Sequence, residues 1–353
     1  MTSARSLIAR CMQAAIFLGT TAIAAQSRAD ESANASLSPT PAQESGTITV
    51  LFENDVFYRT DRDYTNGTQI AWTSPRLDSD DWASRLAENL PILSSDTEFR
   101  KSYAIGQDIF TPSDISLKDP PLDDHPYAGY LYGALGLLGK KTDESGLSSS
   151  LDQLQVQLGV VGPASLAAET QKFIHSILND TKPEGWHTQL RNEPALLIGY
   201  EHSWRYRLVL PAHIEFQVDP HIGGAIGNVY DFANAGAMAR AGFNLPDDYG
   251  PPRVDPSLPG SYSFEPRKDG KLGAYVFAGV DGRLVGHNIF LDGNTWQDSR
   301  HVNKDIAVGD LNFGAAVVWD RFRLTYTHVF RTREFETQHG ADQFGAISLS
   351  VRY

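Results

Sequence analysis

Cysteine is nearly absent from this sequence, whose 353 residues contain only Cys11. A disulfide framework is therefore excluded, because it needs paired cysteines. Basic residues are also scarce: 30 Lys and Arg stand against 43 Asp and Glu, which gives a formal net charge of −13. A protein that neutralises nucleic-acid phosphates needs the opposite balance, so no nucleic-acid partner is expected.

Long hydrophobic runs are missing too. Beyond residue 25, no stretch approaches the roughly 18–20 apolar residues of a membrane-spanning helix. Residues 1–25 combine Arg5 and Arg10, a short apolar run and small residues, which predicts a secretory signal peptide. Cys11 lies within it, so the mature chain would have no thiol for catalysis. Residues 26–45 are mostly polar and rich in Ser and Pro, and we expect a disordered leader there.

What the chain does contain is an alternation of apolar and polar residues with a period of two. Ile214, Phe216 and Val218 alternate with polar residues, and the last segment, which ends at Tyr353, has the same pattern. Such alternation predicts half-buried strands. Two folds are compatible with it. In a soluble sandwich the apolar face turns inward, and in a membrane barrel it turns toward lipid.

Three features favour the membrane barrel. The chain carries an export signal and has no Cys in its mature part, and it ends on an aromatic residue that closes an alternating strand. Aromatic pairs also occur near strand ends, where an interfacial girdle would need them: Tyr130/Tyr132, Trp204/Tyr206, Trp319/Phe322 and Tyr326/Phe330. We therefore predict an all-β fold over residues 46–353, an antiparallel transmembrane β-barrel of about 12 strands in the bacterial outer membrane.

The even strand count places both termini on the periplasmic side. One short helix, Pro163–Leu178, is predicted on the extracellular rim, with Ser165 as its N-cap. The predicted strands are Ile48–Arg59, Tyr64–Ser74, Lys101–Phe110, Ala128–Gly139, Leu151–Val161, Pro194–Tyr206, Ala212–Ile226, Tyr230–Gly242, Lys271–Gly286, Val308–Asp320, Phe322–Thr332 and Gln343–Tyr353.

Strand parity groups the connections. If the first strand runs outward, the connections 1–2, 3–4 and 5–6 share the extracellular rim, and these are the segments with the most unusual polar residues: 54–67, 107–130 and 162–193. The Pro-rich 8–9 connection, residues 244–269, falls on the periplasmic side and is expected to be chemically bland. The pattern predicts a single site that faces the outer leaflet.

The first of these segments contains adjacent Asn54 and Asp55, which run against β propensity. A carboxylate, an amide and nearby carbonyls are hard oxygen donors that suit Ca²⁺. Equally, the polar residues that follow in 61–67 can simply build a hairpin turn. The residues alone leave both interpretations open.

The third segment places Gln171 and His175 on one face of the predicted helix. His is the natural general base near neutral pH, although an isolated helix His more often caps or packs. His187 is a weaker second candidate. A Gly-x-Ser-x-Gly elbow does not occur, so nothing local marks a nucleophilic serine.

Several spaced motifs together resemble a known family, the outer-membrane lipid A 3′-O-deacylases of LpxR type. The resemblance spans almost the whole mature chain. The motifs that carry it occur in order: Glu53-Asn54-Asp55, Asp63-Tyr64-Thr65-Asn66-Gly67, Gln107-Asp108-Ile109-Phe110-Thr111-Pro112, Gly159-Val160-Val161-Gly162-Pro163, Gln171-x-x-x-His175 and Gly185-Trp186-x-x-Gln189-Leu190.

The resemblance implies a twelve-stranded barrel and Ca²⁺-dependent release of the 3′-acyloxyacyl group of lipid A, with the following roles. Asp55, Asn54 and carbonyls near Thr65 would hold Ca²⁺ against the ester carbonyl. His175 would activate water without a covalent intermediate, and Gln171 would orient water or substrate.

Two departures from the family pattern concern the substrate. Some relatives carry a Lys/Arg cluster after the Thr-Pro-Ser-like turn, where this chain has residues 113–119 with Lys118 among several acids. Where a relative has a Glu after the helix His, this chain has Asp180-Thr181.

The expected partners are the outer membrane, lipopolysaccharide as substrate and the barrel assembly machinery during insertion, with the protein a monomer. Two alternatives from other classes remain. One is a non-enzymatic barrel, such as a porin or a structural protein, and the other is an outer-membrane phospholipase.

Overall fold

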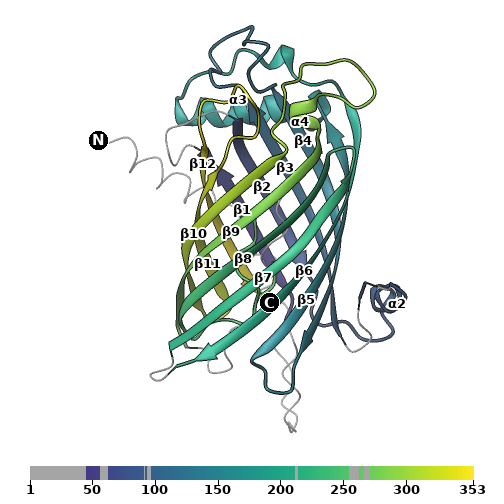
Figure 1. Cartoon of the computed structure of the whole chain (residues 1–353), viewed down its shortest axis with the longest axis vertical. Helices are drawn as coiled ribbons and strands as arrows, with labels where there is room; N and C mark the ends of the chain where they lie inside the picture. Colours follow the sequence, from purple (N-terminus) through teal and green to yellow (C-terminus); the bar gives the residue numbers. More distant parts are fainter. Residues whose placement is uncertain are drawn as a thin grey trace, which may run out of the picture.

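The computed structural model describes residues 45–55, 63–90, 92–93, 97–210, 214–253, 262–265 and 271–353. These residues form one closed antiparallel barrel of twelve strands, in which each strand pairs with its neighbours in the chain and β1 pairs with β12 (Figure 1). The predicted fold class is confirmed. The predicted signal peptide and almost all of the leader lie outside the described residues.

The strand bounds agree with the predicted segments to within a few residues. Residues 56–59, the predicted end of the first strand, lie outside the described residues. The strands are β1 (Thr47–Asn54), β2 (Asp63–Thr73), β3 (Glu98–Thr111), β4 (Ala128–Thr142), β5 (Ser148–Val161), β6 (Glu193–Val209), β7 (Ile214–Gly227), β8 (Tyr230–Phe243), β9 (Gly273–Asn288), β10 (Ala307–Trp319), β11 (Phe322–Arg331) and β12 (Asp342–Arg352).

The barrel wall has apolar side chains outside and charged side chains inside, the reverse of the arrangement in a soluble protein. Along β9, Val276, Val280 and Leu284 are exposed on the outside, whereas the alternating Asp281 and Arg283 are buried inside. A strand with apolar residues outside and charges inside suits a barrel that faces lipid. Of the two folds compatible with the period-two pattern, the structure therefore has the barrel with an apolar outer wall.

The aromatic residues divide between the two faces. Trp204, Tyr206 and Trp319 are exposed on the outer wall, as an interfacial girdle requires. Tyr130 and Tyr132 are instead fully buried within the interior aromatic cluster, so their assignment to the girdle is wrong. Alternation alone could not distinguish outward-facing from inward-facing aromatic residues, because an aromatic ring fits either face of a strand.

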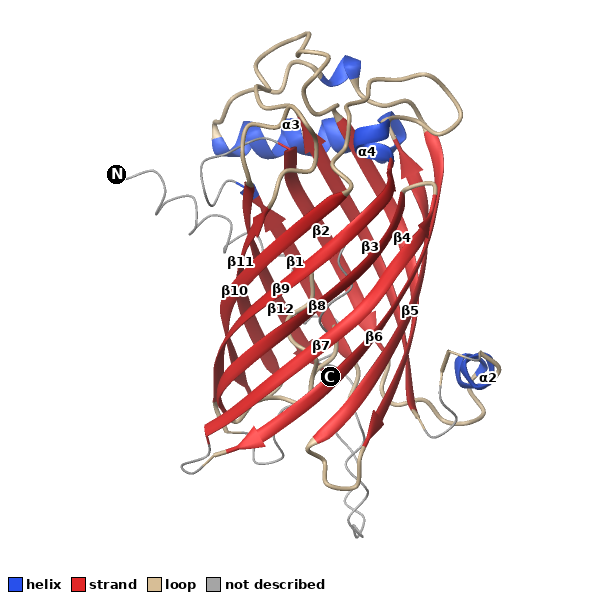
Figure 2. Ribbon diagram, viewed as in Figure 1, coloured by secondary structure: helices blue, strands red, loops and turns tan. Residues whose placement is uncertain are grey.

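Helices are short and lie at the two ends of the barrel (Figure 2). None in the described part of the chain is long and apolar enough to cross a membrane. Besides the expected helix, the described part of the chain contains two α-helices that were not predicted, each too short to show a periodic pattern. The helical elements are α2 (Trp82–Glu88), η2 (Pro163–Ser165), α3 (Ala167–Leu178), η3 (Trp186–Thr188) and α4 (Ile289–Asp292).

The two ends of the barrel differ. We call the end that carries α3 and α4 the helix rim, and the opposite end, where Tyr353 N donates to Gly46 O at 3.2 Å, the terminal rim (Figures 1 and 2). Because consecutive strands alternate in direction, the connections 1–2, 3–4 and 5–6 all lie at the helix rim. The predicted grouping of the three polar segments at one end is confirmed.

The 8–9 connection is not chemically bland, and that expectation is wrong. Its Asp248 forms buried ion pairs with Arg240 of β8 and with Arg323 of β11, the latter at 2.5 Å. Its Asp247 pairs with Arg205 of β6 and, at 2.6 Å, with Lys140 of β4. The connection therefore folds into the barrel and joins strands from around its circumference.

Toward the helix rim the interior holds a cluster of aromatic rings packed among buried charges. Phe290 of α4 stacks on Phe110 of β3 with ring centroids 4.1 Å apart, and Tyr64, Tyr230 and Phe344 belong to the same buried cluster. The Arg331 guanidinium lies 5.1 Å from the centre of the Phe344 ring, and Arg323 lies 4.9 Å from that of Phe264, so charged and aromatic side chains pack together at both levels. This filling argues against a wide aqueous pore of the porin type and stiffens the wall that carries the rim residues.

We expect Asp248→Asn to destabilise the barrel by about 3 kcal/mol, because it leaves two buried guanidinium groups without their shared carboxylate. The measurement is the temperature at which the folded barrel loses its faster mobility in gel electrophoresis. Asp143→Asn, which changes an exposed acid in the 4–5 turn, is the matched control and should have little effect. Equal unfolding temperatures for the two variants would contradict a structural role for the inserted connection.

Candidate active site

The helix-rim ends of β1 and β2 bring two asparagines opposite each other. Asn54, the last residue of β1, pairs in register with Asn66 of β2. Asn66 Nδ2 donates to the main-chain oxygen of Glu53 at 3.0 Å, which fixes the amide against β1. Glu53 accepts from the Tyr64 hydroxyl within the interior, so the alternating Asn54 belongs to the outer side of the wall.

A bulge in β2 determines where Thr65 lies. The register with β3 shifts between Tyr64 and Asn66, so Thr65 is the extra residue. A bulge re-aims a side chain relative to the strand. Here the Thr65 hydroxyl meets the Thr111 hydroxyl at 2.7 Å, and both residues are buried. Sequence reasoning assigned no role to Thr111, although it lies in one of the resemblance motifs.

Asp55 follows β1 directly and is completely buried. Within the described residues, no group of three or more His, Cys, Asp and Glu side chains is arranged to hold a metal ion. The predicted donors are the Asp55 carboxylate, the Asn54 amide and carbonyls near Thr65, all of them oxygen ligands. This donor chemistry fits a hard cation such as Ca²⁺ and does not fit Zn²⁺, which prefers nitrogen and sulfur.

Helix α3 begins one turn later than expected. Ser165 ends the preceding 3-10 turn η2, and the residue that caps α3 is Leu166, in the left-handed conformation with φ of 61°. The assignment of Ser165 as N-cap is therefore wrong. The Ser165 carbonyl instead accepts from Gln107 Nε2 at 2.6 Å, which ties the start of the helix to β3.

This helix packs on the outside of the wall. Along β3, Asp108 and Phe110 alternate with Gln107 and Ile109, and Phe110 lies in the interior aromatic cluster. Ile109 instead packs with Ala167 and Ala168 of α3. On β4, a Cβ built on Gly129 would lie 2.2 Å from the Cβ of Ala167, so only glycine permits this close approach.

Gln171 lies on the buried side of α3. Its Oε1 accepts a hydrogen bond from Trp186 Nε1 at 2.7 Å, whereas its Nε2 has no hydrogen-bond partner among the described residues. Trp186 is itself buried and packs on Tyr127, with ring centroids 4.8 Å apart. Trp186 therefore fixes the amide orientation, and the N–H₂ group keeps its capacity to donate. The sequence signal for Trp186 was the Gly-Trp motif, to which no role was assigned.

His175 lies one turn further along α3 and is also buried. Its Nδ1 is 2.6 Å from the main-chain oxygen of Thr181. A carbonyl only accepts, so Nδ1 carries the proton and Nε2 is the basic nitrogen of the neutral ring. The exposed Asp180 does not supply this bond, because its carboxylate accepts from the adjacent Thr181 N–H at 2.7 Å. The Thr181 carbonyl therefore orients the imidazole, as a carboxylate does in catalytic sites that pair a histidine with an acid.

The five predicted residues come from two neighbouring parts of one rim. Asn54, Asp55 and Thr65 lie at the ends of β1 and β2, and Gln171 and His175 lie on α3, which packs on β3 and β4. Strand β3 joins the two groups, since it pairs with β2 and carries α3. Helix α3 lies on the outer side of the wall, and Asn54 belongs to that same side of β1.

The turn after β3 is acidic. Ser113 is followed by Asp114, whose pKa is lowered by a hydrogen bond from the Ser116 hydroxyl, so this carboxylate is ionised at neutral pH. Lys118 is exposed, and Asp119 is 3.3 Å from His187 Nε2. This turn thus offers a phosphorylated headgroup little net positive charge.

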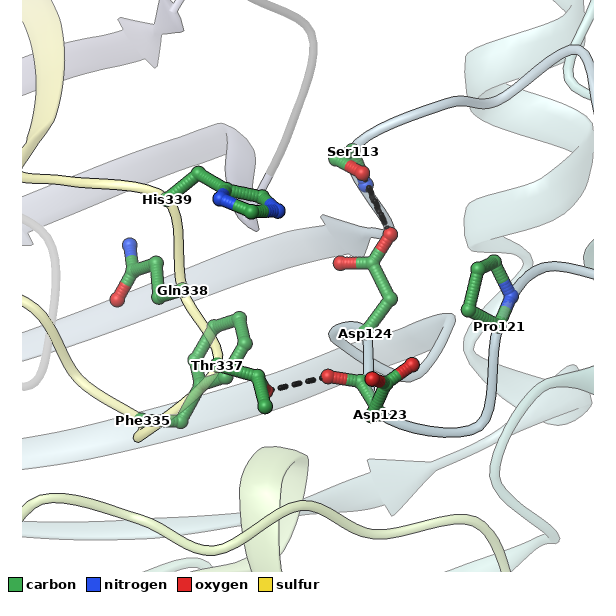
Figure 3. Close-up of a pocket in the computed structure, with 8 residues that line it drawn as sticks. All are labelled: Ser113, Pro121, Asp123, Asp124, Phe335, Thr337, Gln338 and His339. Carbon is green, nitrogen blue, oxygen red and sulfur yellow. Dashed lines mark hydrogen bonds between the residues drawn. The ribbon is translucent and has the colours of Figure 1, made fainter.

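The helix rim also contains a cavity, which lies apart from the five predicted site residues. A cavity of about 110 Å³ lies between the 3–4 and 11–12 connections (Figure 3). The Asp124 carboxylate, which lines it, already accepts from the Ser113 main-chain N–H and hydroxyl, at 2.9 and 2.6 Å. None of the five predicted residues lines this cavity, so we do not assign it to the reaction.

Comparison with solved structures finds a similar fold in a known protein. LpxR from Salmonella typhimurium superposes with a TM-score of 0.69 at 19% identity, over 87% of this chain and all of that one. The β domain of the Bordetella autotransporter BrkA gives a TM-score of 0.41 at 7% identity, covering 88% of this chain and 99% of that one. A comparison with curated proteins finds no match.

Comparison with protein families gives the decisive result. The family described as "Outer membrane protein LpxR" matches residues 12–353. The match covers all twelve strands, and it includes both the β1–β2 end with Asn54 and Asp55 and the helix with Gln171 and His175. The chain belongs to the LpxR family of outer membrane proteins.

Proposed function

We propose that the protein is an outer-membrane lipid A deacylase that hydrolyses the 3′-acyloxyacyl ester of lipid A. The observation that carries this proposal is the buried Gln171 and His175 pair on a helix that packs against the outer wall, in a chain of the LpxR family. An outer-wall site suits a lipid substrate, because the acyl chains can stay in the leaflet while the ester reaches the protein.

The reaction is a hydrolysis by activated water. His175 Nε2 takes a proton from water as the water oxygen attacks the ester carbonyl carbon. The bond between that carbon and the 3′ oxygen then breaks, and the protonated imidazole returns the proton to the leaving oxygen. The products are a 3′-hydroxyl on lipid A and a free acyloxyacyl carboxylic acid. The Thr181 carbonyl stabilises the imidazolium, since it accepts from Nδ1–H in both protonation states.

Asp55, Asn54 and carbonyls near Thr65 would hold Ca²⁺. When bound, the cation supplies positive charge near the ester carbonyl oxygen, where negative charge develops. The buried Asp55 carboxylate would be the charged ligand, and the Asn54 amide and the carbonyls near Thr65 would be the neutral ones. The unused Nε2 of Gln171 donates to a water or substrate oxygen.

We expect His175→Gln to slow lipid A deacylation by about 10²- to 10⁴-fold, the usual loss when a general base is removed. The measurement is mass spectrometry of lipid A from cells that express the variant. His187→Gln, an exposed histidine on the same rim, is the matched control and should retain activity. Full deacylation by a folded His175→Gln protein would refute the assignment of the base.

The same mass spectra separate the alternatives for the whole protein. Loss of the 3′-acyloxyacyl mass on expression of the unchanged protein supports the proposed reaction. Unchanged lipid A points to a non-enzymatic barrel, and lysophospholipid points to a phospholipase. Either of these two results would refute the proposed function itself, whatever the variants do.

We expect Asp55→Asn to raise the Ca²⁺ concentration for half-maximal activity by about 10- to 100-fold, because the variant loses the charged ligand. The measurement is deacylation of purified lipopolysaccharide across a Ca²⁺ titration after chelation. Asp123→Asn is the control, because Asp123 is a rim acid outside the predicted metal site and its loss tests whether Ca²⁺ acts only by bridging lipopolysaccharide to acidic residues of the rim. Identical titrations for Asp55→Asn and the unchanged protein would remove Asp55 from the metal site.

We expect Trp186→Phe to lower kcat about tenfold, since one hydrogen bond that orients the Gln171 amide is lost. Phenylalanine keeps the packing against Tyr127, so the barrel should remain folded. A positioning role predicts that kcat falls while KM changes little, whereas disrupted packing of α3 would raise KM and lower the unfolding temperature.

A further inference from the structure

Helix α2 is attached to the outside of the barrel, next to the terminal rim. It belongs to the 2–3 connection and lies beside the wall, at the end away from α3 (Figure 2). Ala83, Ser84 and Ala87 are its buried residues, and Ala87 packs with Phe99 of β3. Phe99 alternates with Arg100, which reaches Glu265 of the inserted 8–9 connection, so Phe99 and the helix lie on the outer side.

The start of α2 is fixed by charge. Asp81 caps the helix by accepting from Ala83 N–H at 2.8 Å, and Lys101 of β3 pairs with the same carboxylate at 2.6 Å. Lys101 Nζ also lies 5.5 Å from the centre of the Trp82 ring. The helix therefore has a defined orientation on β3, and the face that it leaves uncovered is defined as well.

That uncovered face is apolar. Trp82 and Leu86 lie four residues apart, one turn along the helix, and are 47% and 44% exposed. On the other exposed side are Arg85 and Glu88. Short as it is, α2 has a buried face, an apolar exposed face and a charged exposed face.

The apolar face continues the outer wall of the barrel. Further along the outer side of β3, Tyr103 is exposed and stacks on Trp72 of β2 with centroids 5.6 Å apart, and Ile105 follows. Stacked Trp and Tyr rings mark the level where an outer-membrane barrel passes from hydrocarbon to headgroups. Helix α2 lies on the rim side of this pair, at headgroup depth.

We propose that α2 is an interfacial anchor that inserts Trp82 and Leu86 into the phospholipid leaflet nearer the terminal rim. Trp suits this position, because its apolar ring and polar N–H match the boundary between hydrocarbon and water. Nearby charges are balanced: Arg85 pairs with Asp80 at 3.5 Å and Arg76 with Glu98 at 2.9 Å. The contact is therefore with zwitterionic phospholipid through apolar insertion, rather than with anionic lipid through a basic patch.

The test uses the full chain with Cys11→Ser and one new cysteine, Leu86→Cys or Glu88→Cys, labelled with a polarity-sensitive fluorophore. Glu88 is the matched control, since it lies on the same helix but on the charged face. The labelled proteins are folded into vesicles of phosphatidylethanolamine and phosphatidylcholine, and folding is checked by gel mobility. Quenching is then measured with lipids brominated high on the acyl chain and with aqueous iodide.

We expect the label at position 86 to be quenched by the brominated lipids and at least several-fold less by iodide than the label at position 88. Equal iodide quenching at the two positions would overturn the proposal. Protection from iodide without quenching by brominated lipid would overturn it as well, because it indicates a protein contact, from a second copy or another partner. These outcomes do not depend on the deacylation assay.

Discussion

Each strand of the barrel faces lipid on one side and a closed interior on the other, and this constraint governs where every charge can lie. Closure through the β1–β12 pairing satisfies the backbone groups, so that no strand edge is left open. The charged side chains must then point inward and find partners there. Asp310 shows the result, since Arg253, Arg283 and Arg331 all bind this one buried carboxylate. Arg253 comes from the inserted 8–9 connection, which thus completes the interior.

At the helix rim, some polar side chains lie on the outer side of the wall. Asn54, Asn66 and Gln107 lie on the outer side of the wall, where apolar residues would otherwise be expected, and α3 packs alongside them. Outward-facing polar groups are costly against lipid unless protein or an amphiphilic ligand covers them. A covered polar surface next to a leaflet is well suited to bind a molecule that is itself part lipid and part sugar. The proposed deacylation uses this exception to the pattern of the wall.

The strand pair β3–β4 links the two ends of the outer surface. Helix α3 packs on it at the helix rim and α2 packs on it near the terminal rim. Gly129 lets α3 approach closely, and Phe99 provides the contact for α2. A rigid pair of strands thus fixes the separation between the proposed interfacial anchor and the candidate base. The depth of α2 in the membrane would therefore set the depth of His175.

Local patterns in the sequence were enough to predict the strands, the grouping of polar connections at one rim and the shared helix face of Gln171 and His175, because periods of two and of about four residues are properties of neighbouring residues. The burial of Tyr130 and Tyr132 and the insertion of Asp247 and Asp248 into the interior depended on the tertiary structure. Their partners, such as Arg205 and Arg323, lie far away in the chain and meet only when the sheet closes. The same closure decided that the candidate site lies on the outer wall, since alternation distinguishes two faces of a strand and only the closed sheet determines which face is outside.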